Sequence, residues 1–106
     1  MSEGLAASQQ LEFEWDDNKS QQTFQDRGFD FGFATQAFAD PAACREPDLR
    51  LPYGEERVRL YGEIEGRLFV VVYTERQGRI RIISARRANT REVQAHSQRR
   101  PDASDA

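Results

Sequence analysis

The chain of 106 residues has little of the chemistry on which many small proteins depend. One cysteine, Cys44, and one histidine, His96, exclude a disulfide framework and a zinc site built from these residue types. No apolar run approaches the roughly 18 residues that cross a bilayer, and the first residues lack the pattern of an export signal. We therefore expect a cytoplasmic protein that needs no membrane, cofactor or metal ion.

Lysine is also scarce, because fourteen of the fifteen basic side chains are arginine. Residues 1–50 hold four basic and ten acidic side chains, whereas residues 51–106 hold eleven basic and eight acidic ones. Guanidinium groups bind phosphate with two parallel hydrogen bonds and stack on flat rings. The C-terminal half therefore predicts a polyanion or an acidic partner. A solvated surface of intramolecular Arg–Glu pairs is the alternative explanation of the same composition.

The hydrophobic pattern predicts one domain at residues 11–99, between disordered tails at residues 1–10 and 100–106. Residues 11–15 alternate between apolar and polar side chains, as a short strand does. Polar caps predict three helices. These are a helix from Asp16 to Arg27, a helix from Asp30 to Asp40 with a stripe of Phe31, Ala34 and Phe38, and a helix from Asn89 to Gln98.

Three further strands are predicted at residues 55–62, 68–73 and 79–85, after a proline-rich loop at residues 40–54. The order β-α-α-β-β-β-α is typical of an α+β domain, here with a mostly antiparallel four-stranded sheet and helices on one face. Strand alternation directs the apolar residues of the first and third of these strands toward the helices. The opposite face is then predicted to display Arg57, Arg59, Tyr61, Arg79 and Arg81 together.

Arginines and a tyrosine on an open sheet face are suited to binding single-stranded RNA, since they neutralise phosphates and stack bases. Such arginines can also stabilise the phosphorane through which RNA is cleaved. A proton must move as well, and Tyr73, Glu75 and Glu56 are the candidates for this role. Nothing in the carboxylate or histidine spacing fits a metal site. We expect Trp15 to lie in the core and His96 to be a solvated surface residue.

Several short motifs are distributed along the chain. Residues 13–19 read FEWDDNK, residues 28–31 read GFDF, and residues 37–41 read AFADP. Residues 54–57 read GEER, and the most specific stretch, RIISARRA, covers residues 81–88. These motifs resemble those of the BrnT-type toxins, and the resemblance extends from residue 13 to about residue 98.

This resemblance implies a RelE-like fold and a bacterial ribonuclease toxin of a type II toxin–antitoxin pair. It also implies an RNA substrate and a BrnA-type antitoxin with a ribbon-helix-helix part. Operator DNA would be bound only through that antitoxin, in a complex that can contain a toxin dimer. Carried over residue by residue, the resemblance implies RNA-contacting or catalytic roles for Lys19, Arg57, Arg81 and Arg86.

Two positions depart from the family pattern. Asp26-Arg27-Gly28 replaces the usual Lys-His-Gly, and Tyr73 stands where the family often has histidine. Arg27 can bind phosphate but cannot act as a general base, because its pKa is above about 12. Two functions therefore remain open, a metal-independent ribonuclease toxin and a BrnT-like binding module that acts as antitoxin partner and co-repressor. A small scaffold without RNA contact is the third alternative.

Overall fold

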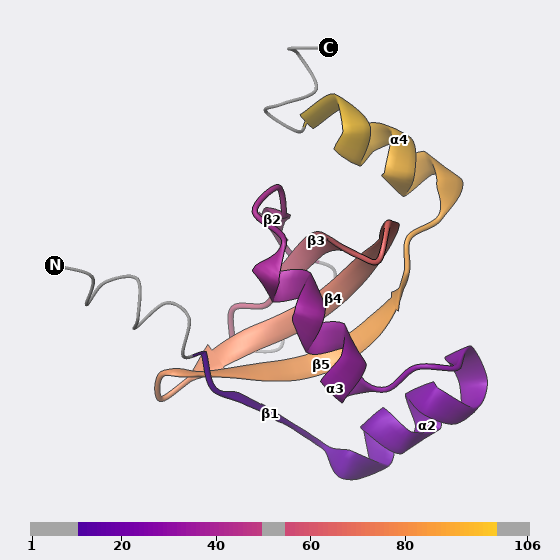
Figure 1. The fold of residues 1–106 in the computed structure, drawn as a ribbon. Coiled ribbons are helices and arrows are strands. Elements are labelled where there is room, and N and C mark those ends of the chain that lie inside the picture. Colours follow the sequence, from indigo (N-terminus) through magenta and orange to yellow (C-terminus); the bar gives the residue numbers. More distant parts are fainter. Residues whose placement is uncertain (1–10, 50–54, 100–106) are drawn as a thin grey trace, which may run out of the picture.

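A computed structural model describes residues 11–49 and 55–99 (Figure 1). The tails expected at residues 1–10 and 100–106, and part of the expected loop, lie outside the described residues. The elements, in order, are β1 (Phe13–Trp15), α2 (Asp17–Arg27), α3 (Phe31–Ala34), η1 (Thr35–Ala39), β2 (Cys44–Pro47), β3 (Val58–Ile64), β4 (Arg67–Arg76), β5 (Arg79–Arg87) and α4 (Thr90–Arg99).

The strands form one five-stranded sheet with the order β1-β5-β4-β3-β2. The α+β class and the mostly antiparallel pairing are confirmed, and only β1 is parallel to its neighbour, β5. The fifth strand, β2, forms in the segment that the prolines predict as a loop. It lies at the sheet edge with Pro47 as its last residue, a position where proline costs no ladder hydrogen bond.

The first helix has the predicted caps. The Asp16 carboxylate accepts hydrogen bonds from the backbone N–H groups of Asn18 and Lys19 at 2.8 and 3.3 Å. Gly28 ends the helix at φ 86°, in the left-handed region that glycine adopts without strain.

The second helix is α-helical only at α3 and continues as the 3₁₀ helix η1. A 3₁₀ helix has three residues per turn, so the buried stripe runs Phe31, Ala34 and Ala37. The expected stripe residue Phe38 is half-buried instead and packs against Phe13 at 5.0 Å between ring centroids.

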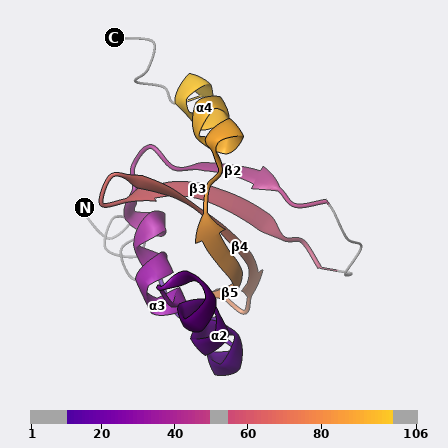
Figure 2. The same cartoon turned by 90° about the vertical axis from the view of Figure 1, so that its right-hand side faces the viewer.

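The core lies between the sheet and the helices α2, α3 and η1, which occupy the same side of the sheet (Figures 1 and 2). Leu60, Val71 and Ile82 project toward this side and are at most 1 % exposed. Gly62 allows the sheet and η1 to approach closely, because a Cβ atom there would lie 2.4 Å from the Ala37 carbonyl oxygen. We call this side the helix-covered face.

The last helix, α4, follows β5 and stands at one end of the sheet (Figure 1). Its His96 stacks on Tyr61 of the face opposite α2 and α3, so α4 differs from the expected placement of the helices on one face. Its capping box is the predicted one, since Glu92 N donates to Asn89 Oδ1 at 2.8 Å and Asn89 N donates to Glu92 Oε1 at 2.9 Å. Within the described ranges, none of the helices has the length and apolar character that crossing a membrane requires.

Candidate functional site

Several arginines lie on the face of the sheet opposite α2 and α3, and we call four of them the arginine face: Arg57, Arg59, Arg81 and Arg86. Arg59 lies in β3, and Arg81 and Arg86 lie in β5. Arg57 precedes β3, where its carbonyl oxygen extends the β2–β3 ladder by accepting a hydrogen bond from Asp48 N at 2.8 Å. Strand alternation therefore directs Arg57 to the same side as Arg59, as predicted.

The central strand β4 runs between these arginines. Val72 stands opposite Arg59 of β3, and Val70 stands opposite Arg86 of β5. Both valines are at most 5 % exposed, although α2 and α3 lie on the other side of the sheet. The aliphatic stems of long arginine side chains cover apolar surface in this way while their charged ends remain accessible.

Each member of the arginine face is held by a glutamate. The pairs are Arg57 with Glu55 at 3.2 Å, Arg59 with Glu46 at 3.1 Å, Arg81 with Glu14 at 3.3 Å, and Arg86 with Glu92 at 2.7 Å. The four carboxylates come from separate segments of the chain: β1, β2, the residues before β3, and α4. The Arg–Glu pairs considered from the composition are therefore present. A phosphate group bound at this face must compete with these carboxylates.

Arg79 extends the arginine face toward the sheet edge. It pairs with Glu12 at 3.2 Å and with Glu14 at 3.7 Å, and 56 % of its side chain is exposed. Glu14 thus lies between Arg79 and Arg81.

Tyr61 lies on the same face but beneath α4, where only 5 % of it is exposed. The His96 ring stacks on it at 6.4 Å between centroids, and the Arg99 guanidinium lies 5.3 Å from its ring centre. The expectation that Tyr61 is open to stack a base is therefore not met in this conformation. The expectation of a solvated His96 is wrong, because the ring is 2 % exposed where the helix meets the sheet.

The surroundings shift the pKa values of three groups on this face. Hydrogen bonds from Arg86 lower the pKa of Glu92 to about 2. The pKa of Glu55 is also lowered, chiefly by its hydrogen bond with Arg76. Burial raises the pKa of Tyr61 above its ordinary value. Near neutral pH, Tyr61 therefore retains its proton, and Glu92 is an ionised and very weak base.

A comparison with protein families identifies the type of protein. Residues 15–92 match the family model described as "Ribonuclease toxin, BrnT, of type II toxin-antitoxin system". The chain belongs to the BrnT family. No curated protein matches it.

The BrnT match extends from the end of β1 to the first turn of α4. It includes all four residues of the arginine face and the carboxylates Glu46, Glu55 and Glu92. His96 and Arg99, which cover Tyr61, lie beyond the matched segment. Membership in the family implies an RNA target and an antitoxin partner for this chain.

Two of the candidate RNA-contacting residues do not join the arginine face. Lys19 and Arg27 have exposed side chains on α2, which packs against α3 and β5 on the helix-covered side. The sheet therefore lies between these two cations and the arginine face.

Tyr73 also lies on the helix-covered face. It is 5 % exposed, packs against Phe38 at 5.1 Å, and accepts a hydrogen bond from Arg45 Nε at 3.1 Å. Glu75, two residues further along β4, shares this orientation, and Glu56 is an exposed residue ahead of β3. The positions of Tyr73 and Glu75 do not support a joint action with the arginine face. Across residues 11–49 and 55–99, no three His, Cys, Asp or Glu side chains gather as metal ligands would.

Proposed function

We propose that this BrnT-family protein is an endoribonuclease that cleaves RNA on the arginine face without a metal ion. In this reaction the 2′-oxygen bonds to phosphorus and the P–O5′ bond breaks. The products are a 2′,3′-cyclic phosphate and a 5′-hydroxyl end. The proton of the 2′-hydroxyl passes to a general base, and the leaving O5′ takes up a proton.

The observation that carries this proposal is the placement of four guanidinium groups on one face by β3 and β5, the two strands that flank β4. A well-placed donor stabilises a developing oxyanion by about 2.7–4 kcal/mol. A half-exposed ion pair such as Arg81–Glu14 contributes only about 0–1 kcal/mol. A phosphorane can therefore displace the glutamates, which hold the arginines in position until RNA binds.

The general base is proposed to be a glutamate of this face. Arginine cannot accept a proton near neutral pH, and Glu92 is too weak a base. Glu14 and Glu46 each contact an arginine of the face, so a phosphate that displaces them leaves a carboxylate beside the reacting 2′-hydroxyl.

The test is cleavage of a 5′-labelled RNA by the purified protein with EDTA present. The proposal expects cyclic-phosphate ends from the wild type and loss of cleavage in Arg81→Gln. Arg91→Gln is the matched control, since Arg91 is an exposed arginine on α4 that takes no part in the ion pairs of the arginine face. Full activity in Arg81→Gln with an unchanged melting temperature contradicts the proposal.

The proposed setting is a cytoplasmic toxin that arrests translation and is neutralised by a BrnA-type antitoxin. The ribbon-helix-helix part of that antitoxin would bind operator DNA, and the complex would contain a toxin dimer. Support comes from the family and from the charged surface of the toxin. If charge pairs dominate, the complex weakens strongly between low and high salt, and an affinity that stays constant indicates apolar contacts.

A binding module without catalysis is the second candidate. The observation in its favour is that all four arginines are already paired and that α4 covers Tyr61. This candidate predicts tight antitoxin binding and operator repression by a wild-type protein that leaves RNA intact.

A further inference from the structure

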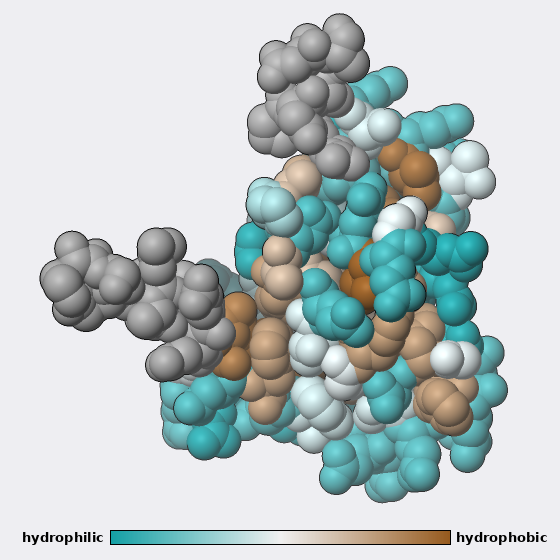
Figure 3. All heavy atoms as spheres, viewed as in Figure 1, coloured by the Kyte–Doolittle hydropathy of each residue, from teal (hydrophilic) through white to brown (hydrophobic). Residues whose placement is uncertain are grey.

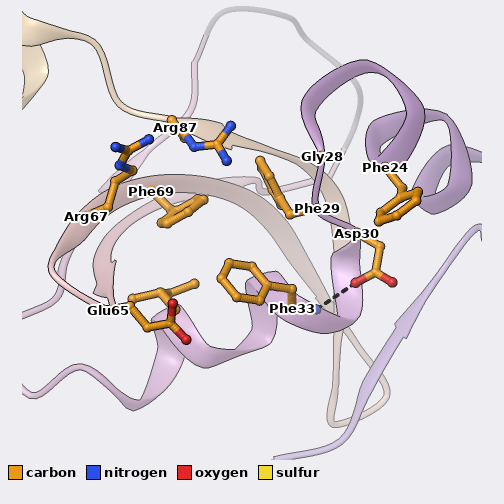
Figure 4. A pocket seen from close by; sticks show the side chains of 10 residues that line it. Phe24, Gly28, Phe29, Asp30, Phe33, Glu65, Arg67, Phe69 and Arg87 are labelled. Atoms are coloured by element: carbon orange, nitrogen blue, oxygen red, sulfur yellow. Dashed lines mark hydrogen bonds between the residues drawn. The ribbon is translucent and has the colours of Figure 1, made fainter.

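A second site with arginines lies on the helix-covered face (Figure 4). A recess of about 380 Å³ opens between the β3–β4 turn, the end of β5 and the connection from α2 to α3. Phe29, Phe33 and Phe69 line it and contact one another edge-on or at a tilt, with ring centroids 5.1 to 6.0 Å apart. Phe24 of α2 also lines it and is 56 % exposed, so its ring is accessible to a ligand in the recess.

Two arginines, Arg67 and Arg87, line the same recess. The Arg87 guanidinium lies 5.2 Å from the centre of the Phe29 ring and 5.8 Å from that of Phe69, and it donates to the Arg27 carbonyl oxygen at 3.0 Å. Among the residues that the structure describes, neither Arg67 nor Arg87 forms an ion pair with a carboxylate. These cations thus differ from those of the arginine face, whose charges are met by glutamates.

The lining indicates a ligand that combines a flat ring with an anion. Guanidinium groups bind phosphate in two-pronged geometry, and exposed aromatic rings stack nucleobases of any sequence. The volume lies at the lower end of the range for small-ligand pockets, which fits one nucleotide. A partner helix needs a groove several turns long, and this recess does not supply one. The space-filling view from this side shows apolar surface exposed between hydrophilic side chains around α2 and α3 (Figure 3).

We propose that this recess, which we call the aromatic pocket, binds one nucleotide of the RNA, with its phosphate on Arg67 and Arg87 and its base beside Phe24 and Phe33. The pocket is close to the arginine face along the chain. Arg86 and Arg87 are consecutive residues of β5 that lie on opposite faces of the sheet, the first paired with Glu92 and the second over the pocket rings. An RNA strand that passes around the end of β5 would reach both sites. The inference rests on the proposed function, because it takes RNA to be the ligand.

The experiment is a titration of the full chain with adenosine 5′-monophosphate, followed by the NMR signals of the arginine Nε–H groups. Inorganic phosphate and adenosine serve as half-ligands. The nucleotide is expected to shift the Arg87 signal and to bind more tightly than either half-ligand. Arg67→Gln and Phe24→Ala are each expected to weaken this binding by about tenfold, an effect at the level of one lost stacking or charged contact. Both side chains are exposed, so neither change threatens the fold.

The controls separate this inference from the proposed function. Arg91→Gln should bind the nucleotide as the wild type does. In Arg81→Gln, which no longer cleaves RNA, the nucleotide should still shift the NMR signal of Arg87. Nucleotide binding is read without cleavage, so an inactive protein still tests the pocket. The inference is overturned if the nucleotide leaves the Arg87 signal in place, or if Arg67→Gln and Phe24→Ala bind it normally. It is also overturned if these variants lose only antitoxin binding, because the pocket then belongs to a peptide.

Discussion

The arginine face and the aromatic pocket hold their guanidinium groups by different contacts. On the arginine face every guanidinium is paired with a glutamate. In the aromatic pocket the Arg87 guanidinium rests on phenylalanine rings and a backbone carbonyl oxygen. A phosphate must displace a carboxylate at the first site, whereas at the second Arg67 and Arg87 form no ion pair among the described residues, although Asp30 and Glu65 also line the pocket.

The largest effect is expected when the arginine face is broken at Arg57. Arg57→Gln removes a donor to the phosphorane and should lower the single-turnover cleavage rate by about 10²–10³-fold, the cost of losing one oxyanion donor. The measurement is the decay of a labelled RNA at saturating protein. Arg67→Gln, in the aromatic pocket, should raise the protein concentration needed for half-maximal cleavage. It should leave the cleavage rate at saturating protein within about twofold of the wild-type rate.

Removing the charge of a glutamate on the arginine face is expected to strengthen RNA binding. Glu14→Gln removes the carboxylate that pairs with Arg79 and Arg81, so phosphate no longer competes with it. Binding of a 2′-O-methyl RNA, which cannot be cleaved, should tighten by about three- to tenfold. Glu75→Gln removes the same charge on the helix-covered side and is the matched control. If both variants bind the RNA more tightly by the same factor, the affinity depends only on the net charge of the protein.

The contact between Glu92 and Arg86 makes stability depend on pH. The pKa of Glu92 is lowered from 4.5 to about 2 in the folded protein. Its contribution to the free energy of unfolding is therefore present above pH 4.5 and is lost as the pH falls from there to about 2. Glu92→Gln should cost about 1–2 kcal/mol at pH 7 through the ion pair and the capping box. Thermal unfolding between pH 2 and 7 should show a shallower dependence in the variant; identical slopes contradict the assignment.

The smallest effect is expected for Arg27→His, which introduces the residue that the motif resemblance leads us to expect at this position. Arg27 has an exposed side chain at the end of α2, on the other side of the sheet from the arginine face. Histidine at this position should leave the cleavage rate within about twofold and add no limb to the pH profile. A rate gain of tenfold or more would instead place proton transfer near α2.

The parts of this structure that depend on local rules follow from the sequence. Asp16, Gly28 and the Asn89–Glu92 box mark helix ends because their capping bonds span only a few residues. Strand alternation places Arg59 and Arg81 on one face because the side-chain period of a strand is two.

The features that the sequence does not reveal depend on contacts between distant segments. The glutamate partners of the arginine face come from four segments, so no spacing indicates them. The sequence does not reveal the docking of α4 either, because a histidine rather than an apolar stripe packs against the sheet. The aromatic pocket combines a turn, two helices and the ends of three strands, and only the fold brings these together.

RNA binding on the arginine face is tested most directly by one NMR titration that observes every arginine at once. A 2′-O-methyl RNA of a few nucleotides is added to the full chain, and the Nε–H signals are followed at low salt. The account predicts that the signals of Arg57, Arg59, Arg81 and Arg86 shift together with one dissociation constant, while that of Arg91 on α4 stays in place. Signals of the arginine face that do not move at saturating RNA would contradict it.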